Sequence, residues 1–468
     1  MIATPTTASG RGLVLTVMCA GMFLVLLDVT IVNVALPAIG HGLRAAVAQL
    51  QWVVDGYVVA IAGLLLAAGT LGDRIGHRRM LLTGFALFGA ASLACALAPG
   101  IEVLIGARVA QGVGGAVLLP STMAVIVEVF PGRAEQAKAL GTWAAVSSLA
   151  LPCGPLLGGV LVTHIGWRPV FWIAVPLTIV AAVAARFVVP VDAARRGGRV
   201  DVPGLAGFVV GLSALIFAII AAGHHGGPVR ILAAGAVAVS GLTVSVARAR
   251  RGADPFLPLD LLRRGEFLAP NVVAVLMNLI VNGILFVSTL YLQDTLGRSA
   301  AAAGLAVVPL AVPLVILAPV SGRLTARYGP RPAIVAGCVL AAAGSAGLTR
   351  LAAAGGIGLL LGSFTLLGCG AGLITASVVA ATVRATPAQR SGLATGVSNT
   401  ARQIGTACGV AIFGAVAGAP SATGFPGRIH LLGAGSAIVW VVAAVITLCA
   451  VDRGSRPAAA VAVTEPAR

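Results

Sequence analysis

The sequence predicts an all-α membrane protein with fourteen transmembrane helices, arranged as two bundles of six around an inserted pair (6+2+6). Composition is the first reason. Hydrophobic residues make up 59% of the 468 residues and charged residues only 10%, whereas soluble domains carry about 25% charged residues. Pattern is the second reason, because continuous apolar runs of about 20 residues, long enough to span a bilayer, recur along the whole chain.

The apolar runs are separated by short segments that carry charges, Gly or Pro, which predicts where each helix begins and ends. The expected helices, in order, are 13–36, 50–71, 80–98, 101–127, 139–163, 167–189, 203–222, 229–247, 268–292, 302–322, 332–349, 355–379, 391–417 and 429–450. They group into an N-terminal six-helix bundle (13–190), a linker with an inserted two-helix hairpin (191–267), a C-terminal six-helix bundle (268–451) and a tail (452–468).

The basic residues support this layout, because cytoplasmic loops of membrane proteins are enriched in Lys and Arg. With both termini cytoplasmic, most of the 31 basic residues fall in loops on the cytoplasmic side. Each loop on the opposite side holds one: Arg44, Arg168, Arg230, Arg298, Arg350 and Arg428. The net charge of +17 therefore indicates topology, not nucleic acid binding, and predicts a multi-pass protein of the cell (cytoplasmic) membrane.

A sequence repeat indicates two related halves. GTLGDRIGHRR begins at Gly69 and GRLTARYGPRP begins at Gly322, each between the second and third expected helix of its bundle. Both copies fall on the cytoplasmic side, which predicts parallel repeats related by an axis along the membrane normal. The first copy also has an acid, Asp73, where the second has Ala326. Matching positions are Gly69 and Gly322, Leu71 and Leu324, Arg74 and Arg327, Gly76 and Gly329, and Arg78 and Arg331.

Asp28 is the most informative charge inside an expected helix, in the stretch LDVTIVNVALP. A carboxylate near the bilayer centre costs about 2.5–3.5 kcal/mol, and such residues commonly mark ion or proton pathways. Burial disfavours the charged form, so this group can take up and release a proton near neutral pH. The alternative is a carboxylate that only makes a packing hydrogen bond within the bundle.

Two further charges share the depth of Asp28. At 1.5 Å per residue, Asp28, Arg108 and Asp55 lie about 12, 10 and 8 Å from the outer membrane surface. We hypothesise that Asp28 is the main proton carrier and that Arg108 adjusts its proton affinity. Asp55 either takes part in proton coupling or extends to the outer surface, two alternatives of equal weight. Candidate cavity residues are Asn33, Gln111, and Arg402, which faces the cavity or pairs with a carbonyl.

Several segments in order resemble the major facilitator superfamily, and more narrowly its fourteen-helix drug:proton antiporters. They include GTLGDRIGHRR between helices 2 and 3, LDVTIVNVALP in helix 1 and IGARVAQGVGGA (105–116) in helix 4. In helix 5, LPCGPLLGG (151–159) resembles the antiporter motif, although Ala150 stands where that motif usually opens with Gly. The motif residues are Pro152, Gly154, Pro155, Gly158 and Gly159.

The resemblance implies a major facilitator fold that exports drug-like or antibiotic amphipathic compounds by proton antiport with alternating access. The alternative is a proton-coupled transporter of a small metabolite. The resemblance also implies a conformational gate in the loop after helix 2, formed by Gly69, Asp73, Arg74, Gly76 and Arg78; a static loop clamp is the alternative. The helix 5 motif would limit leak, or would only pack helices closely.

An enzyme is not expected, because the six His are scattered and Walker A glycines are absent around Lys138, the single Lys. We expect no cofactor beyond the proton gradient, and the lipid bilayer, protons and a small-molecule substrate as partners of a monomer.

Overall fold

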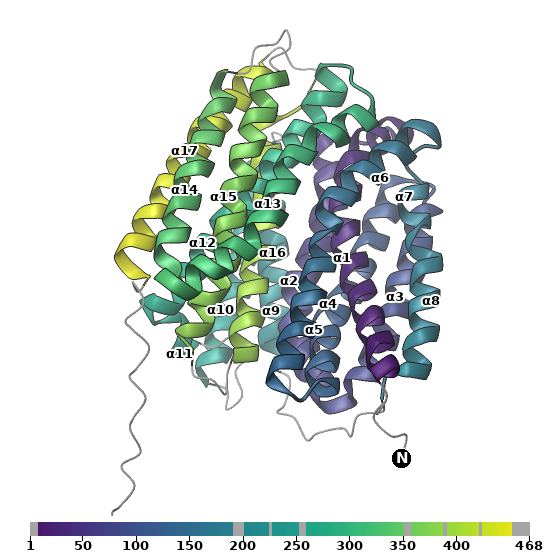
Figure 1. Cartoon of the computed structure of the whole chain (residues 1–468). Helices are drawn as coiled ribbons and strands as arrows, with labels where there is room; N and C mark the ends of the chain where they lie inside the picture. The colour runs from purple at the N-terminus through teal and green to yellow at the C-terminus, as the bar shows by residue number, and fades with distance from the viewer. Residues whose placement is uncertain are drawn as a thin grey trace, which may run out of the picture.

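The computed structural model describes residues 8–190, 201–223, 227–251, 259–350, 357–386, 391–420 and 424–451. Long helices form two lobes side by side, the purple-to-blue N-terminal lobe and the green-to-yellow C-terminal lobe (Figure 1). Helix α1 begins and α17 ends at the same end of the molecule, which we call the terminal end; the opposite end is the far end. The tail 452–468, expected to be cytoplasmic, lies outside the described residues.

The N-terminal bundle comprises α1 (Ala8–Leu43), α2 (Val47–Ile75), α3 (His77–Ala96), α4 (Ile101–Val129), α5 (Arg133–Ser148), α6 (Ala150–His164), α7 (Pro169–Trp172) and α8 (Ala174–Val188). The hairpin comprises α9 (Val202–Gly223) and α10 (Pro228–Arg251), and α9 packs against both α2 and α16. The C-terminal bundle comprises α11 (Leu259–Leu262), α12 (Gly265–Leu290), η1 (Tyr291–Thr295), α13 (Ala300–Tyr328), α14 (Pro330–Gly347), η2 (Leu348–Arg350), α15 (Ile357–Arg384), α16 (Ser391–Ala417) and α17 (Phe425–Ala450).

Thirteen helical segments of the described chain are long and apolar enough to cross a membrane. The helix missing from that set is α16, whose bounds match the expected helix 391–417 and which packs between α2 and α12. Its first half carries several polar side chains, among them Asn399, Arg402 and Gln403. The count of fourteen spans therefore stays a prediction, although a helix occurs at every expected position.

The fifth and sixth expected helices are each broken, and proline explains both breaks. Leu149 separates α5 from α6, and Ile173 separates α7 from α8. Each break lies three residues before a proline, Pro152 or Pro176. Proline has no N–H to donate to the carbonyl four residues earlier, and its ring crowds that carbonyl, so the helix is interrupted at this point.

The sequence repeat has the same geometry in both halves. Gly76 and Gly329 have φ angles of +102° and +82° and each links the second helix of its bundle to the third. This left-handed region favours glycine. Two residues further on, Arg78 donates a hydrogen bond to the carbonyl of Arg186 in α8, and Arg331 donates one to the carbonyl of Leu448 in α17. Each arginine therefore ties the third helix of a bundle to the last helix of that bundle.

A candidate proton and substrate site in the N-terminal bundle

A buried cluster of polar side chains joins α1 to α4. The guanidinium of Arg108 forms an ion pair with the carboxylate of Asp28, and these side chains are 1% and 4% exposed. Gln111 bridges both partners: its Nε2 donates to Asp28 Oδ1 at 2.9 Å and its Oε1 accepts from Arg108 Nη1 at 2.7 Å. Asp28 and Arg108, which the sequence places at one depth, are thus in direct contact with each other and with Gln111.

Groups on α2 and α3 hold this cluster in place. Arg108 Nε donates to the carbonyl of Val53 at 2.9 Å, and its guanidinium lies 4.2 Å from the centre of the Tyr57 ring. Gln111 Nε2 also donates to Ser92 Oγ on α3 at 2.8 Å. A buried cation is favourable only when charge and hydrogen bonds compensate it, and Arg108 has an anion, an amide oxygen, a carbonyl and an aromatic face.

The helix 4 motif allows this close approach. A Cβ added to Gly112 would lie 2.4 Å from the carbonyl oxygen of Tyr57, which leaves room at this position only for glycine. This contact brings the backbones of α2 and α4 together one turn from Arg108. Close approach through small residues is common between membrane helices.

Asp55 does not extend to the surface, so that alternative from the sequence is wrong. Its side chain is fully buried, and neither carboxylate oxygen has a hydrogen-bond partner among the described residues. One turn earlier on α2, Gln51 Nε2 donates to the carbonyls of Val410 and Ala411 on α16. Side chains four residues apart share a helix face, so Asp55 lies on the face of α2 that meets the C-terminal bundle.

The remaining candidate cavity residues lie apart from the Asp28–Arg108–Gln111 cluster. Asn33 is 6% exposed, and its Oδ1 has no partner in the described part of the chain. Arg402 is half-buried in the middle of α16 in the opposite bundle. No carbonyl of the described residues accepts a hydrogen bond from the Arg402 guanidinium, so the pairing that the sequence left open is not formed there.

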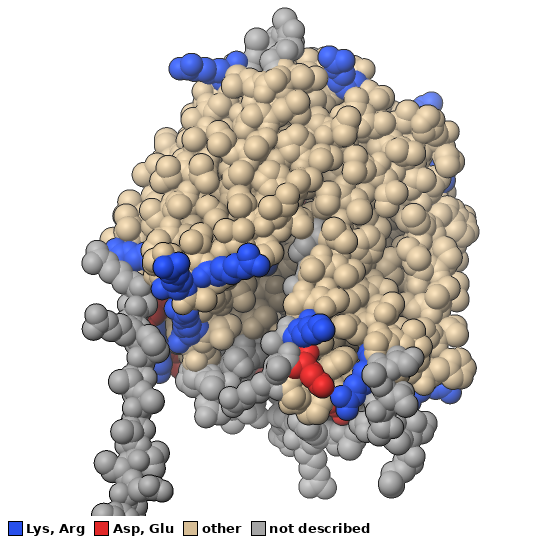
Figure 2. Space-filling model, viewed as in Figure 1, with Lys and Arg blue, Asp and Glu red and all other residues tan. Residues whose placement is uncertain are grey.

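Hydrogen bonds between the two bundles gather at the far end. Besides the two bonds from Gln51, Gln293 Nε2 donates to the carbonyl of Val34 at 2.9 Å, and the backbone N–H of Ala301 donates to Thr163 Oγ1 at 3.0 Å. His41 and Asp294 lie 3.1 Å apart at the surface. In the lower half of Figure 2, toward the terminal end, a hollow separates the two lobes.

Glycines of the helix 5 motif form part of this far-end contact. A Cβ on Gly154 or Gly158 would collide with Thr30 or Ile31 of α1, and a Cβ on Gly159 would lie 2.8 Å from the carbonyl oxygen of Ala300 in α13. A Cβ on Gly304 of α13 would likewise lie 2.1 Å from the carbonyl oxygen of Pro155 in α6. Helix α6 is thus held tightly between its own bundle and the opposite one.

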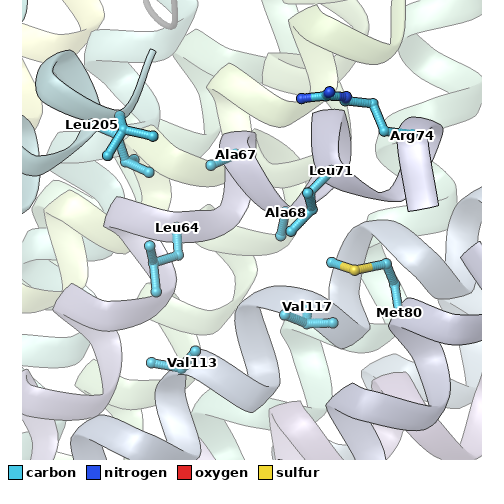
Figure 3. A pocket seen from close by; sticks show the side chains of 10 residues that line it. Leu64, Ala67, Ala68, Leu71, Arg74, Met80, Val113, Val117 and Leu205 are labelled. Atoms are coloured by element: carbon cyan, nitrogen blue, oxygen red, sulfur yellow. The ribbon is translucent and has the colours of Figure 1, made fainter. Parts of the chain in front are cut away.

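The expected gating loop lies at the terminal end. Gly69, Asp73 and Arg74 belong to the last turns of α2, and the Asp73 side chain lies outside the described set. Arg74 extends over the rim of an apolar pocket of about 590 Å³, formed by residues such as Leu64 and Val113 with Leu205 of α9 (Figure 3). Arg78 donates a hydrogen bond to a residue of its own bundle, Arg186. This contact fits the static loop clamp, which is the alternative to a conformational gate.

Sequence reasoning missed three residues that complete the site: Gln51, Tyr57 and Ser92. In QWVVDGYVVA, Gln51, Asp55 and Tyr57 are the polar residues of an otherwise apolar stretch. Polar residues inside an expected membrane helix are candidates for functional sites, so Gln51 and Tyr57 could have been selected on the same ground as Asp55. Ser92 gives no such signal, because a serine hydroxyl can satisfy itself on its own helix, as Ser92 also does with the Phe88 carbonyl at 2.7 Å.

Comparison with known proteins agrees with this architecture. The family model described as Major Facilitator Superfamily matches residues 18–410 and 272–463. The chain is 35% identical to the methylenomycin A resistance protein of Streptomyces coelicolor, over 86% of this chain and 85% of the relative. It is 35% identical to the tetracenomycin C resistance and export protein of Streptomyces glaucescens, over 87% and 76%.

A third relative is the multidrug efflux pump LfrA of Mycolicibacterium smegmatis, which is 31% identical over 88% of this chain and 82% of the relative. Among solved structures, a peptide transporter crystallised with sulfate superposes with a TM-score of 0.69 over 93% of this chain and 94% of that chain. Its sequence identity is 14%, so that likeness concerns the fold alone.

Proposed function

This chain belongs to the major facilitator superfamily, and we propose that it exports drug-like or antibiotic amphipathic compounds from the cell in exchange for protons. The observation that carries the proposal is the buried Asp28–Arg108–Gln111 cluster, an ionisable carboxyl group held inside the membrane layer. Relatives named for resistance and export support the direction of transport.

The two-lobed arrangement fits a state that loads substrate from the cytoplasm. The hydrogen bonds at the far end hold the bundles together there, and the hollow lies toward the terminal end. The excess of basic residues in loops at the terminal end supports its placement in the cytoplasm. Alternating access then requires the bundles to separate at the far end and to meet at the terminal end.

Asp28 exchanges the transported proton in this proposal. The ion pair with Arg108 holds Asp28 as a carboxylate, while protonation removes the charge that attracts the guanidinium. Arg108 retains the Val53 carbonyl and the Tyr57 ring as partners, so protonation changes the cluster without unfolding it. Export follows when substrate binding favours release of the proton inside, and proton uptake outside favours release of substrate.

Asp55 acts as a second proton site at the far-end contact. A buried carboxyl group without hydrogen bonds is far less costly as the neutral acid than as the anion, so Asp55 carries a proton in the arrangement seen here. Separation of α2 from α16 would break the Gln51 bonds and expose Asp55 to the outside. This site thereby couples far-end opening to proton exchange.

Expression in a host that lacks its own efflux pumps tests the proposal. We expect the protein to protect against at least one amphipathic antibiotic, with methylenomycin A and tetracenomycin C included in the panel. A protonophore should abolish that protection. Uptake of a metabolite without protection against any compound would contradict export and favour the metabolite carrier.

A further inference from the structure

Helix α16 of the C-terminal bundle has a polar face. Asn399, Arg402 and Thr406 follow one another at spacings of three and four residues, so they share one side of the helix. Asn399 is exposed and Arg402 is half-buried, although both lie in the middle part of a helix that packs between α2 and α12.

Contacts on the other sides of α16 identify where this polar face points. A Cβ on Gly405 or Gly409 would lie 2.2 Å from a backbone oxygen of α12, so these glycines mark the side toward α12. Gly414 lies against the Gln51 side chain and marks the side toward α2. By helical geometry the polar face lies between these two sides, and so between α12 of one bundle and α2 of the other.

Neighbouring polar groups of α12 line the same sector. Asn282 Nδ2 donates to Thr406 Oγ1 at 3.2 Å, and both Asn282 and Asn278 are half-buried. Polar side chains that remain accessible at mid-membrane depth face water and not lipid. We therefore assign Asn278, Asn282, Asn399, Arg402 and Thr406 to the wall of the hollow between the lobes.

Among the described charged side chains near the hollow, a positive charge is available to a substrate and negative charges are not. Arg402 lies about 17 Å along α16 from Ser391, and its guanidinium has no hydrogen-bond or ion-pair partner among the described residues. In the described C-terminal bundle, acidic residues occur near helix ends, as Glu266 and Asp294 do. In the N-terminal bundle Asp28 is already neutralised by Arg108, and Asp55 is fully buried at the far-end contact.

We propose that Arg402 binds the acidic group of the substrate and that the transported compounds are amphipathic anions, such as carboxylates and phenolates, in preference to lipophilic cations. An unpaired guanidinium in the membrane layer gains a charge-assisted hydrogen bond from such a ligand. The Asn278 and Asn282 amides supply further polar contacts, and the apolar walls accommodate the rest of the molecule. The inference rests on the proposed export function and adds the substrate class.

Two xanthene dyes of similar size give a direct test. Fluorescein is anionic at pH 7.5 and rhodamine 123 is cationic, so their binding to the purified full chain in nanodiscs can be compared by fluorescence anisotropy. We expect fluorescein to bind at least tenfold more tightly than rhodamine 123. Equal or tighter binding of rhodamine 123, or no binding of fluorescein, overturns the inference.

Variants at Arg402 assign the effect to this side chain. Arg402→Gln should weaken fluorescein binding about ten- to a hundredfold, the range expected for loss of a charged hydrogen-bond donor. Arg402→Lys should recover part of the affinity because it keeps the positive charge. Arg230→Gln, which removes a charge from an exposed position on α10, is the matched control and should bind like the unmodified protein.

The same experiment distinguishes a loss of binding from a loss of folding. The unfolding temperature of each variant in the nanodisc is compared with that of the unmodified protein. If Arg402→Gln is unstable, Arg402→Lys provides the folded variant for the binding comparison. Full fluorescein affinity in a folded Arg402→Gln protein contradicts the inference. Intact, Arg402-dependent dye binding without proton-driven transport would instead contradict the proposed export function and leave the substrate class standing.

Discussion

The guanidinium of Arg108 on α4 pairs with the carboxylate of Asp28 on α1, 80 residues earlier in the chain, and both side chains are buried. Truncating one partner of a buried ion pair leaves an uncompensated charge and typically costs about 3–5 kcal/mol. Arg108→Gln should therefore lower thermal stability in detergent markedly. The double variant Asp28→Asn/Arg108→Gln should recover much of this loss, and stability losses that simply add would contradict a direct pair.

Asp55 gives the opposite expectation for stability. Because its carboxyl group is buried without hydrogen bonds, an Asn of similar shape replaces the neutral acid at little cost. Asp55→Asn should keep the unfolding temperature close to that of the unmodified protein while it lowers drug-dependent proton movement severalfold. Unchanged coupling in proton-flux measurements on vesicles would show that Asp55 is not a second proton site.

Gly304 tests the far-end contact between the bundles. A Cβ at this position would lie 2.1 Å from the carbonyl oxygen of Pro155, and overpacking of this kind typically costs about 1–3 kcal/mol. Gly304→Val should therefore favour the state that is open at the far end, measured as a longer distance between spin labels on α6 and α13. Gly106→Val is the control, because a Cβ at Gly106 meets no atom within 4 Å; equal effects of both changes would contradict the contact.

Arg78 and Arg331 should behave alike, because each bonds a carbonyl of the last helix of its own bundle. Arg78→Gln and Arg331→Gln should each lower stability by about 0.5–1.5 kcal/mol, the net contribution of an ordinary hydrogen bond, because both bonds are exposed. Thermal unfolding of both variants measures this. A normal stability with abolished transport in Arg78→Gln alone would favour a conformational gate over a static clamp.

The sequence was sufficient for the fold class and for part of the site. Counting residues from the helix ends placed Asp28 and Arg108 at one depth, and the structure brings them into contact. Depth along a helix does not determine which way a side chain points, so the sequence cannot decide whether Asp55 faces the surface or the interior. The Gln51 contacts with α16 show that this face of α2 is buried. The helix breaks before Pro152 and Pro176 could not be predicted from the sequence either, since many prolines in membrane helices leave the helix continuous.

The pairing of Arg78 within its own bundle could not be predicted either. The loop motif gives the turn at Gly76, whose φ of +102° needs glycine, but not the distant carbonyl that the arginine reaches. Arg78 and Arg186 are 108 residues apart in the sequence. Their contact depends on how the third and last helices of the bundle pack, and local sequence patterns carry no information about that packing.

Proton coupling through Asp28 is the central claim, and uphill transport by the Asp28→Asn variant tests it most directly. Everted vesicles of matched protein content are given an imposed pH gradient, and accumulation of the best substrate is measured with and without that gradient. The account predicts that gradient-driven accumulation falls at least tenfold in Asp28→Asn, while Glu135→Gln, which removes an exposed surface acid of the N-terminal bundle, retains it. Full gradient-driven accumulation by Asp28→Asn would contradict the account.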